Sequence, residues 1–270
     1  MSHKLLLDAT QFASLNQNKD LLIIDLGSRE QYLLGHIPGA LHLDYATITG
    51  ELPTTPGPLP EHLALTQALR SLGLQTHQHI IAYDHNDNAQ ACRFLWSLDL
   101  IEHPSHSLFN GGMQAYIDAG LPTEQTENAS QTSTAILRYR QHAPSADIGY
   151  ILQHYQDAKV SIIDARSAAE YNSTDVRAQR GGHIPDAINF DYRQVFETNQ
   201  LGKLRPLNEL QAIIEQAGIK LDDELICHCQ SHRRSAVLYF VFKLLGAKNV
   251  KGYPGSWAEW GNRLDTPIQV

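Results

Sequence analysis

The sequence of 270 residues is 42% hydrophobic and 19% charged, which is ordinary for a globular protein in water. Its formal net charge of -8 argues against broad nucleic-acid binding, because that function needs a basic stripe to neutralise phosphates. No hydrophobic run approaches the roughly 20 residues that cross a bilayer. Since this length is large for one compact core, we expect two domains.

The cysteines and the N-terminus indicate the compartment. Cys92, Cys227 and Cys229 are an odd number, and the last two are separated by a single residue, so they form no disulfide framework. Residues 1–8 lack the apolar stretch and the small-residue cleavage site of a signal peptide. Both features predict a protein of the reducing cytoplasm.

The first half of the chain alternates predicted strands and helices. A short run of hydrophobic residues at 21–25 ends in Asp25 and is followed by a Gly-His-Ile-Pro motif at 35–38. A second predicted strand, residues 80–84, precedes a helix around residues 92–96, and a glycine-aromatic turn closes this half at residues 110–116. This alternation predicts an α/β fold with a mainly parallel sheet flanked by helices.

The second half repeats the same order. Predicted strands at residues 160–164 and 224–229 flank a second Gly-His-Ile-Pro motif, and a glycine-aromatic turn again closes the half. The polar residues 124–134 read as an exposed linker. We therefore expect two tandem domains, at residues 1–124 and 146–270, with a linker and the start of the second domain at residues 125–145.

A cysteine stands where the second copy changes from strand to helix. Cys229 ends an apolar strand, polar residues follow, and we expect a helix to begin at Ala236. The free N–H groups of a helix start, its dipole and nearby guanidinium groups all favour an anion, so the pKa of this thiol should lie below about 8.5. The candidate anion-binding residues of the loop are Gln230, Ser231, His232, Arg233, Arg234 and Ser235.

The first copy lacks the thiol. Asp84 stands at the position of Cys229, and uncharged and acidic residues replace the cationic loop. A carboxylate in a loop that favours anions cannot be the same catalyst as a thiolate. We therefore expect the first domain to have lost the catalytic activity and to help shape the cleft.

The second copy also has a longer segment before its Gly-His-Ile-Pro motif. This segment, residues 172–180, is polar and contains Arg177 and Arg180. It is either a solvated loop or a loop that grips the substrate. Arg166, whose counterpart is Gly27, is expected to support the site through Asp164, and Trp257 is expected to form part of its wall.

Together, the repeat, the doubled Gly-His-Ile-Pro motif, the Cys229 loop and the Gly-Ser-Trp-Ala-Glu-Trp-Gly ending resemble a tandem-domain rhodanese, a sulfurtransferase. The resemblance implies an inactive N-terminal domain, a catalytic C-terminal domain and Cys229 as the nucleophile. It also implies that the thiolate takes sulfur from thiosulfate or 3-mercaptopyruvate as a persulfide and passes it to cyanide, a thiol or a protein thiol. This chemistry requires neither a metal nor an organic cofactor.

The donor is less defined. The resemblance places basic residues directly after the cysteine in thiosulfate enzymes and small uncharged ones in mercaptopyruvate enzymes, whereas this chain has Gln230 and Ser231. It also implies a donor-binding arginine at the position of Glu170. We favour thiosulfate because Arg233 and Arg234 lie in the loop, with Arg177 or Arg180 as candidates to replace the arginine.

Three other functions are open to test. A cysteine-based phosphatase needs an arginine where Ser235 stands, and Arg234 falls one residue short. A metal site built from Cys227, His228, Cys229 and His232 is disfavoured because neighbouring strand residues point to opposite faces and no second Cys-x-x-Cys exists. A non-catalytic interaction module would not need the retained thiol. We expect small-molecule partners rather than nucleic acid or membrane.

Overall fold

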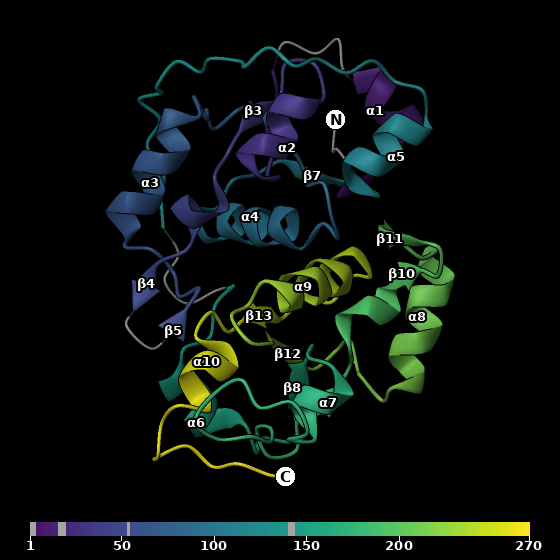
Figure 1. Ribbon diagram of the computed structural model, residues 1–270. Coiled ribbons are helices and arrows are strands. Elements are labelled where there is room, and N and C mark those ends of the chain that lie inside the picture. Colours follow the sequence, from purple (N-terminus) through teal and green to yellow (C-terminus); the bar gives the residue numbers. More distant parts are fainter. Residues whose placement is uncertain (1–3, 16–19, 53–54, 140–143) are drawn as a thin grey trace. The chain divides into compact units, whose positions relative to one another are not determined.

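The structure is a computed structural model that describes residues 4–15, 20–52, 55–139 and 144–270. It divides the chain into two compact units (Figure 1). The first comprises Met1–Thr49, Pro60–Arg140 and Phe196–Leu204, and the second comprises Gly50–Leu59, Gln141–Val195 and Arg205–Val270. Each unit thus takes one short segment from the other half of the sequence.

The first unit contains a sheet, its helices and a small hairpin. Its elements in chain order are β1 (Leu6–Leu7), α1 (Ala9–Leu15), β2 (Leu21–Asp25), α2 (Arg29–Leu34), β3 (Leu41–His42), the 3₁₀ helix η1 (Tyr45–Ile48), α3 (His62–Ser71), β6 (His79–Tyr83), α4 (Ala89–Leu100), β7 (His106–Phe109), α5 (Gly112–Asp118), β10 (Phe196–Glu197) and β11 (Gln200–Leu204).

The second unit repeats this plan. Its elements are β4 (Glu51–Leu52), β5 (Thr55–Pro56), α6 (Ile148–His154), β8 (Val160–Asp164), α7 (Ala168–Tyr171), β9 (Ile188–Asn189), the 3₁₀ helix η2 (Tyr192–Val195), α8 (Leu207–Gln216), β12 (Glu224–His228), α9 (Arg234–Leu244), β13 (Val250–Gly252) and α10 (Ser256–Trp260).

The two main sheets have matching strand orders. The first is ordered β1-β7-β6-β2-β3 and the second β13-β12-β8-β9, and every strand pair within them is parallel. Parallel sheets are covered by helices on both faces, which explains why β6 is buried along its whole length. The predicted α/β fold with two tandem domains is confirmed.

The helix after the central strand is buried on nearly every side in both units. In α9 every residue from Ser235 to Phe242 is buried, and α4 is buried almost as completely. A helix of this kind forms because core contacts surround it, rather than because it has one apolar stripe. The α9 helix begins at Arg234, so the predicted start at Ala236 is wrong by two residues. The N-terminal turn of α9 therefore includes a charged side chain of the cysteine loop.

A tyrosine-histidine stack fixes each Gly-His-Ile-Pro motif. The ring of His36 stacks on Tyr32 with centroids 3.7 Å apart, and the ring of His183 stacks on Tyr171 at 3.6 Å. In both copies the histidine Nδ1 also lies within hydrogen-bond distance of the tyrosine carbonyl. The stack is present in both copies, whether or not a cysteine follows, so it serves to fix the loop.

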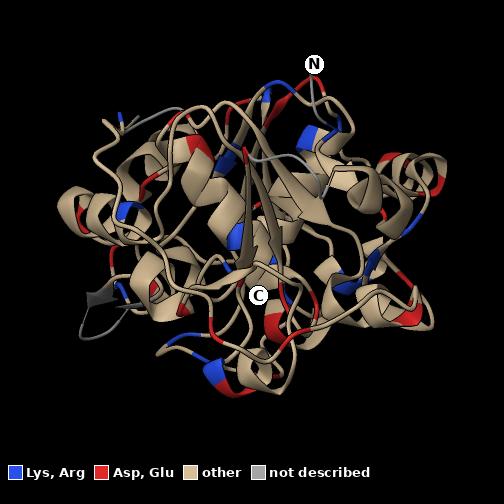
Figure 2. Cartoon of the chain, turned by 90° about the horizontal axis from the view of Figure 1, so that it is seen from above, with Lys and Arg blue, Asp and Glu red and all other residues tan. Residues whose placement is uncertain are grey.

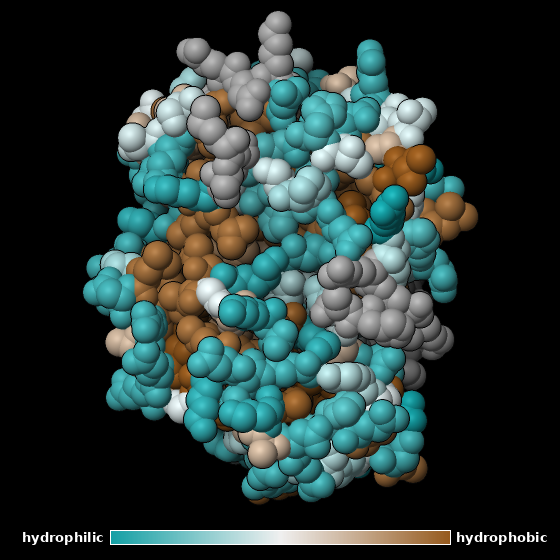
Figure 3. Space-filling model, turned by 180° about the vertical axis from the view of Figure 1, so that it is seen from behind, coloured by the Kyte–Doolittle hydropathy of each residue, from teal (hydrophilic) through white to brown (hydrophobic). Residues whose placement is uncertain are grey.

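Among the described residues, basic and acidic side chains occur in both units. Figure 2 shows basic and acidic residues interspersed along the ribbon rather than gathered into one stripe. Exposed large hydrophobic side chains such as Leu34, Ile136 and Leu264 are spread over the sequence, and Figure 3 shows apolar atoms between hydrophilic ones on one face. Among the described residues, no helix is long and apolar enough to span a membrane.

Candidate active site

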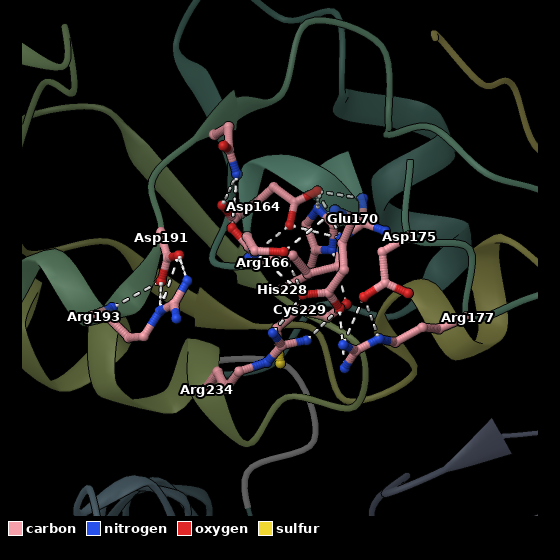
Figure 4. A network of polar contacts seen from close by, with 12 residues as sticks. Asp164, Arg166, Glu170, Asp175, Arg177, Asp191, Arg193, His228, Cys229 and Arg234 are labelled. Carbon is pink, nitrogen blue, oxygen red and sulfur yellow. Dashed lines mark hydrogen bonds and ion pairs between the residues drawn. The ribbon is translucent and has the colours of Figure 1, made fainter. Parts of the chain in front are cut away.

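Two neighbouring strands of the second unit end at one edge of its sheet. β8 ends at Asp164 and β12 ends at His228, and these residues are paired in the parallel ladder. Cys229 follows β12 directly, so the thiol lies at the carboxyl edge, where open α/β sheets bind their ligands. Figure 4 shows its sulfur beside charged side chains from other elements of the unit.

The loop that begins at Cys229 is fixed by its own side chains. His232 adopts a left-handed backbone with φ of 55°, and its Nδ1 lies 2.7 Å from the Ser235 hydroxyl oxygen. The buried imidazole of His232 packs so closely on Gly252 that a side chain there would overlap the ring. The His232 side chain therefore packs against Gly252 and Ser235 within the protein and fixes the loop, whereas the sequence placed it among the anion-binding residues.

The start of α10 fixes the other side of the loop. The backbone N–H of Trp257 donates to the Cys229 carbonyl at 2.9 Å, and that of Ala258 donates to the Gln230 carbonyl at 3.0 Å. The Ser256 hydroxyl accepts a hydrogen bond from the Cys229 N–H at 3.3 Å. These bonds engage two carbonyls and one N–H group of the loop, whereas the N–H groups of Ser231 and Ser235 act on the sulfur.

The Cys229 thiol is buried and electrostatically activated. Burial raises its pKa, but the Arg234 guanidinium, the Ser235 hydroxyl and the backbone N–H groups of Ser231 and Ser235 favour the thiolate and bring the pKa below its usual value. Burial instead raises the pKa of Cys227 well above the usual value. Of the two neighbouring thiols, only Cys229 is suited to act as a nucleophile.

The cation beside the sulfur is held by a buried carboxylate. Arg234 Nη1 and Nη2 donate to the two oxygens of Glu170 at 2.7 Å each, and the side chains are 16% and 2% exposed. Burial raises the pKa of Glu170, but the contacts with Arg234 and hydrogen bonds from Ser167 outweigh it and lower the pKa to about 2. The Glu170 side chain is therefore an anion at any ordinary pH.

The longer segment of the second copy contributes one arginine to this group. Arg177 Nη1 lies 3.7 Å from Glu170, and its guanidinium also donates to Asp175. The Gln230 side-chain amide donates to the Arg177 carbonyl at 3.0 Å, which joins this segment to the cysteine loop. Arg177 is half exposed, so its guanidinium can reach a ligand in solution.

The other two predicted arginines lie elsewhere. Arg180 donates to the carbonyls of Trp260 and Thr266, so its guanidinium holds the C-terminal segment and does not join the group around Cys229. The Arg233 side chain is exposed, directly before the start of α9. Arg234 and Arg177 are thus the cations that the structure brings to the sulfur and its carboxylate.

A buried ion pair supports the floor of the site. Arg166 donates through Nε and Nη2 to both oxygens of Asp164, and its guanidinium lies over the Trp257 ring at 4.3 Å. His228 Nε2 lies 3.5 Å from the same carboxylate, and burial lowers the pKa of this imidazole, which keeps it neutral. Asp164, Arg166 and Trp257 thus form one buried group, and their supporting role at the site stays a prediction.

In the first copy, the N–H groups of the equivalent loop bind a carboxylate of that loop, the side chain of Asp84. Asp84 follows β6 as Cys229 follows β12, and both loops lead to a helix that starts at the same distance. The Asp84 oxygens accept hydrogen bonds from the backbone N–H groups of Asn86, Asn88 and Gln90 at 2.8–3.1 Å. Burial raises the pKa of Asp84 to about 6. A pocket of about 710 Å³ lies over this edge, lined in part by Gly27.

One residue of the site was not predicted from the sequence as part of it. Glu170, interpreted as a missing donor contact, binds Arg234. The sequence did contain a signal for Glu170: a capping box, Ser167-x-x-Glu170, matches Ser28-x-x-Gln31 in the first copy, but with a charge added. No spacing pattern indicates that this charge meets Arg234.

Among the described residues, no three histidine, cysteine or acidic side chains gather so that they could hold a metal ion. The arrangement instead offers a stabilised thiolate, inward-facing N–H groups and two guanidinium groups. It can attack an electrophilic atom and stabilise an anion that leaves.

The chain is similar to known proteins over nearly its whole length. The family model for the rhodanese-like domain matches twice, at residues 8–119 and 147–263. A thiosulfate sulfurtransferase from Azotobacter vinelandii is 35% identical, covering 93% of this chain and 92% of the relative. A 3-mercaptopyruvate sulfurtransferase from Escherichia coli is 29% identical over 91% of this chain and 87% of its own. The solved structure of SseA from Escherichia coli, described as a 3-mercaptopyruvate sulfotransferase, superposes with a TM-score of 0.84 at 27% identity, covering 94% of this chain and 99% of that one.

Proposed function

The chain belongs to the rhodanese family and is a sulfurtransferase, and we propose that Cys229 transfers sulfur from thiosulfate to a thiol or cyanide. The observation that supports this role most directly is the thiol itself, whose pKa Arg234 and the loop N–H groups bring below its usual value. The alternative donor is 3-mercaptopyruvate.

The proposed reaction has two steps. The Cys229 thiolate attacks the outer sulfur of thiosulfate, a new S–S bond forms, and the old S–S bond breaks with its electron pair on the departing sulfite. The acceptor then attacks the outer sulfur of the persulfide and restores the thiolate. Cyanide leaves as thiocyanate and a thiol leaves as a persulfide, so neither step needs an external oxidant.

The charges around the sulfur suit this order of events. Arg234 faces the sulfur, and the half-exposed Arg177 lies on the longer segment near the same carboxylate. Sulfite carries more concentrated charge than the thiosulfate from which it leaves, so guanidinium groups and loop N–H groups stabilise it as it forms. The preference for thiosulfate rests on these cations and on the relative that carries that name.

The proposed partners are small molecules. They are an anionic sulfur donor and a thiol or cyanide acceptor, with a protein thiol as a further acceptor class; nucleic acid and membranes are not among them. We place the reaction in the cytoplasm, where the reducing environment keeps a reactive thiol free.

Intact-mass spectrometry tests the proposal. Purified protein treated with thiosulfate should gain one sulfur, about 32 Da, and lose it again when cyanide is added. Cys229→Ser should gain no mass, whereas Cys92→Ser, which alters a buried cysteine of the first unit, should behave as the wild type. If Cys229→Ser turns thiosulfate over at the normal rate, the assignment of the nucleophile is wrong. Mass gain with 3-mercaptopyruvate alone would replace the donor and keep the mechanism.

A further inference from the structure

One helix follows strand β2 in the first unit and strand β8 in the second. Its third residue differs between the two copies in charge alone. It is Gln31 in α2 and Glu170 in α7, and each forms a capping box with the serine before its helix, Ser28 or Ser167. Glutamine and glutamate serve this cap equally well, because the side-chain oxygen accepts the N-cap N–H in both. The cap therefore does not explain why the second copy has a carboxylate.

The carboxylate has a second partner that the first copy lacks. Glu170 accepts two parallel hydrogen bonds from Arg234, whereas Ala89 stands at the start of the equivalent helix α4. A two-point contact of this kind fixes the plane of the guanidinium as well as its position. Glu170 is 2% exposed and is itself held by Ser167, so this anchor is rigid.

We propose that Glu170 is a positioning residue, which holds the Arg234 guanidinium against the Cys229 sulfur and so maintains the reactive thiolate. The inference rests on the proposed function for its biological meaning, but it concerns the free enzyme and applies whichever donor is used. Without its anchor, Arg234 has four side-chain torsions free to move, and its average interaction with the sulfur weakens.

Other charged groups face this pair and define what must be controlled. Arg177 and Asp175 approach Glu170 from the segment after α7, and Tyr192 and Arg193 of η2 act on Arg234 at longer range. Beneath the loop lie the Asp164–Arg166 pair, the neutral His228 and the thiol of Cys227. Arg177 contacts Glu170 at 3.7 Å, a longer pair than the two hydrogen bonds of 2.7 Å from Arg234, so a shift in the pKa of the thiol reports chiefly on Glu170 and Arg234.

Two substitutions separate position from charge. Glu170→Gln keeps the cap, as Gln31 does in the first copy, but removes the negative charge and the two-point contact. Glu170→Asp keeps the charge but withdraws the carboxylate from Arg234 by one methylene. If Glu170 acts by position, both variants raise the pKa of the Cys229 thiol, by about one unit. If it acts only as a nearby negative charge, Glu170→Gln lowers the pKa and Glu170→Asp leaves it unchanged.

The measurement uses reduced protein without a sulfur donor, so it is independent of activity. The ultraviolet absorbance of the thiolate, or the rate of alkylation by iodoacetamide, is followed against pH, and Cys229→Ser provides the blank. Glu209→Gln is the matched control, because it breaks an exposed pair between Glu209 of α8 and Arg205, which precedes that helix. It should leave the pKa of the Cys229 thiol unchanged. A lower or unaltered pKa in Glu170→Asp overturns the proposal. Failure of sulfur transfer itself would instead appear in the mass experiment and leave this result intact.

Discussion

The two copies place different groups on equivalent loops. They also give the equivalent buried aspartates, Asp164 and Asp25, different side-chain partners. In the second copy, Asp164 is bound by Arg166, whereas in the first copy Gly27 leaves room for the ring of His85, which lies 2.8 Å from Asp25. In the second copy, the N–H groups of Ser231 and Ser235 act on the Cys229 sulfur. In the first copy, the carboxylate of Asp84 accepts hydrogen bonds from the N–H groups of its own loop.

This difference lies in which group occupies the N–H groups of equivalent loops within the same fold. A carboxylate that is covalently part of the loop satisfies the N–H groups permanently, so they are no longer free for a substrate or a leaving group. The first loop also has no cation at the position of Arg234. The two loops thus differ at two positions, in Asp84 against Cys229 and in Ala89 against Arg234.

The largest expected effect concerns the nucleophile. In the Cys229→Ser chain, the further substitution Asp84→Cys should not restore sulfur transfer, because Ala89 provides no guanidinium and burial alone raises the pKa of a thiol. Turnover of thiosulfate and cyanide measures the effect, and circular dichroism checks that the fold is kept. Turnover clearly above the Cys229→Ser background would show that the loop alone suffices for catalysis.

The next effect concerns the buried aspartates. Arg166→Ala leaves Asp164 buried without its ion pair and should destabilise the protein by about 3–5 kcal/mol. His85→Ala should cost less, about 1–3 kcal/mol, because it removes a single side-chain contact with Asp25, whereas Arg166 donates three side-chain hydrogen bonds to Asp164. Urea unfolding measures both. Arg193→Ala, at an exposed pair, is the control and should change stability by about 1 kcal/mol or less. Equal losses at Arg166 and His85 would contradict the distinction between the two copies.

The smallest effect is a contrast in pH dependence. Burial raises the pKa of Asp84 to about 6 from 3.8, so its contribution to stability is full below pH 3.8 and is lost as the pH rises through 6. For Glu170, burial raises the pKa, but Arg234 and Ser167 outweigh it and lower the pKa to about 2 from 4.5. Its contribution is present above pH 4.5 and is lost as the pH falls towards 2.

Acidification from pH 7 to 5 should therefore stabilise the first unit at Asp84, whereas Glu170 weakens the second unit only below pH 4.5. Hydrogen exchange followed by mass spectrometry reads peptides of the two units separately. The Asp84→Asn variant should lose the response between pH 5 and 7 and keep the one below 4.5. The same response in Asp84→Asn as in the wild type would exclude Asp84 as its source.

Much of the fold follows from local pattern. Hydrophobic runs that end in Asp25 and Asp164, the two Gly-His-Ile-Pro motifs and the closing aromatic turns recur in order, and a recurring pattern of this kind predicts two α/β domains. The position of Cys229 was equally readable, because a thiol between an apolar strand and an apolar helix lies at a strand end. Comparison with Asp84 then identified the copy that retains a nucleophile.

The partners of the charged side chains were not readable in this way. Arg177 and Arg180 were equivalent candidates on one polar segment, yet the structure directs Arg180 to the carbonyls of Trp260 and Thr266, and Arg177 towards Glu170. The start of α9 was misplaced because the polar residues Arg234 and Ser235 look like loop in the sequence, while the backbone there is already helical.

The sequence by itself determined the repeat, the sheet class and the position of Cys229 at a strand end, since each depends on short-range pattern and on residue type. Only the tertiary structure decided that Glu170 holds Arg234, with a bond that joins α7 to α9 across the site. The physical reason is that a long charged side chain can reach many partners, and the packing of the whole unit selects one of them. Burial then favours the paired arrangement of Glu170 and Arg234, because a charge withdrawn from water is stable only beside its partner.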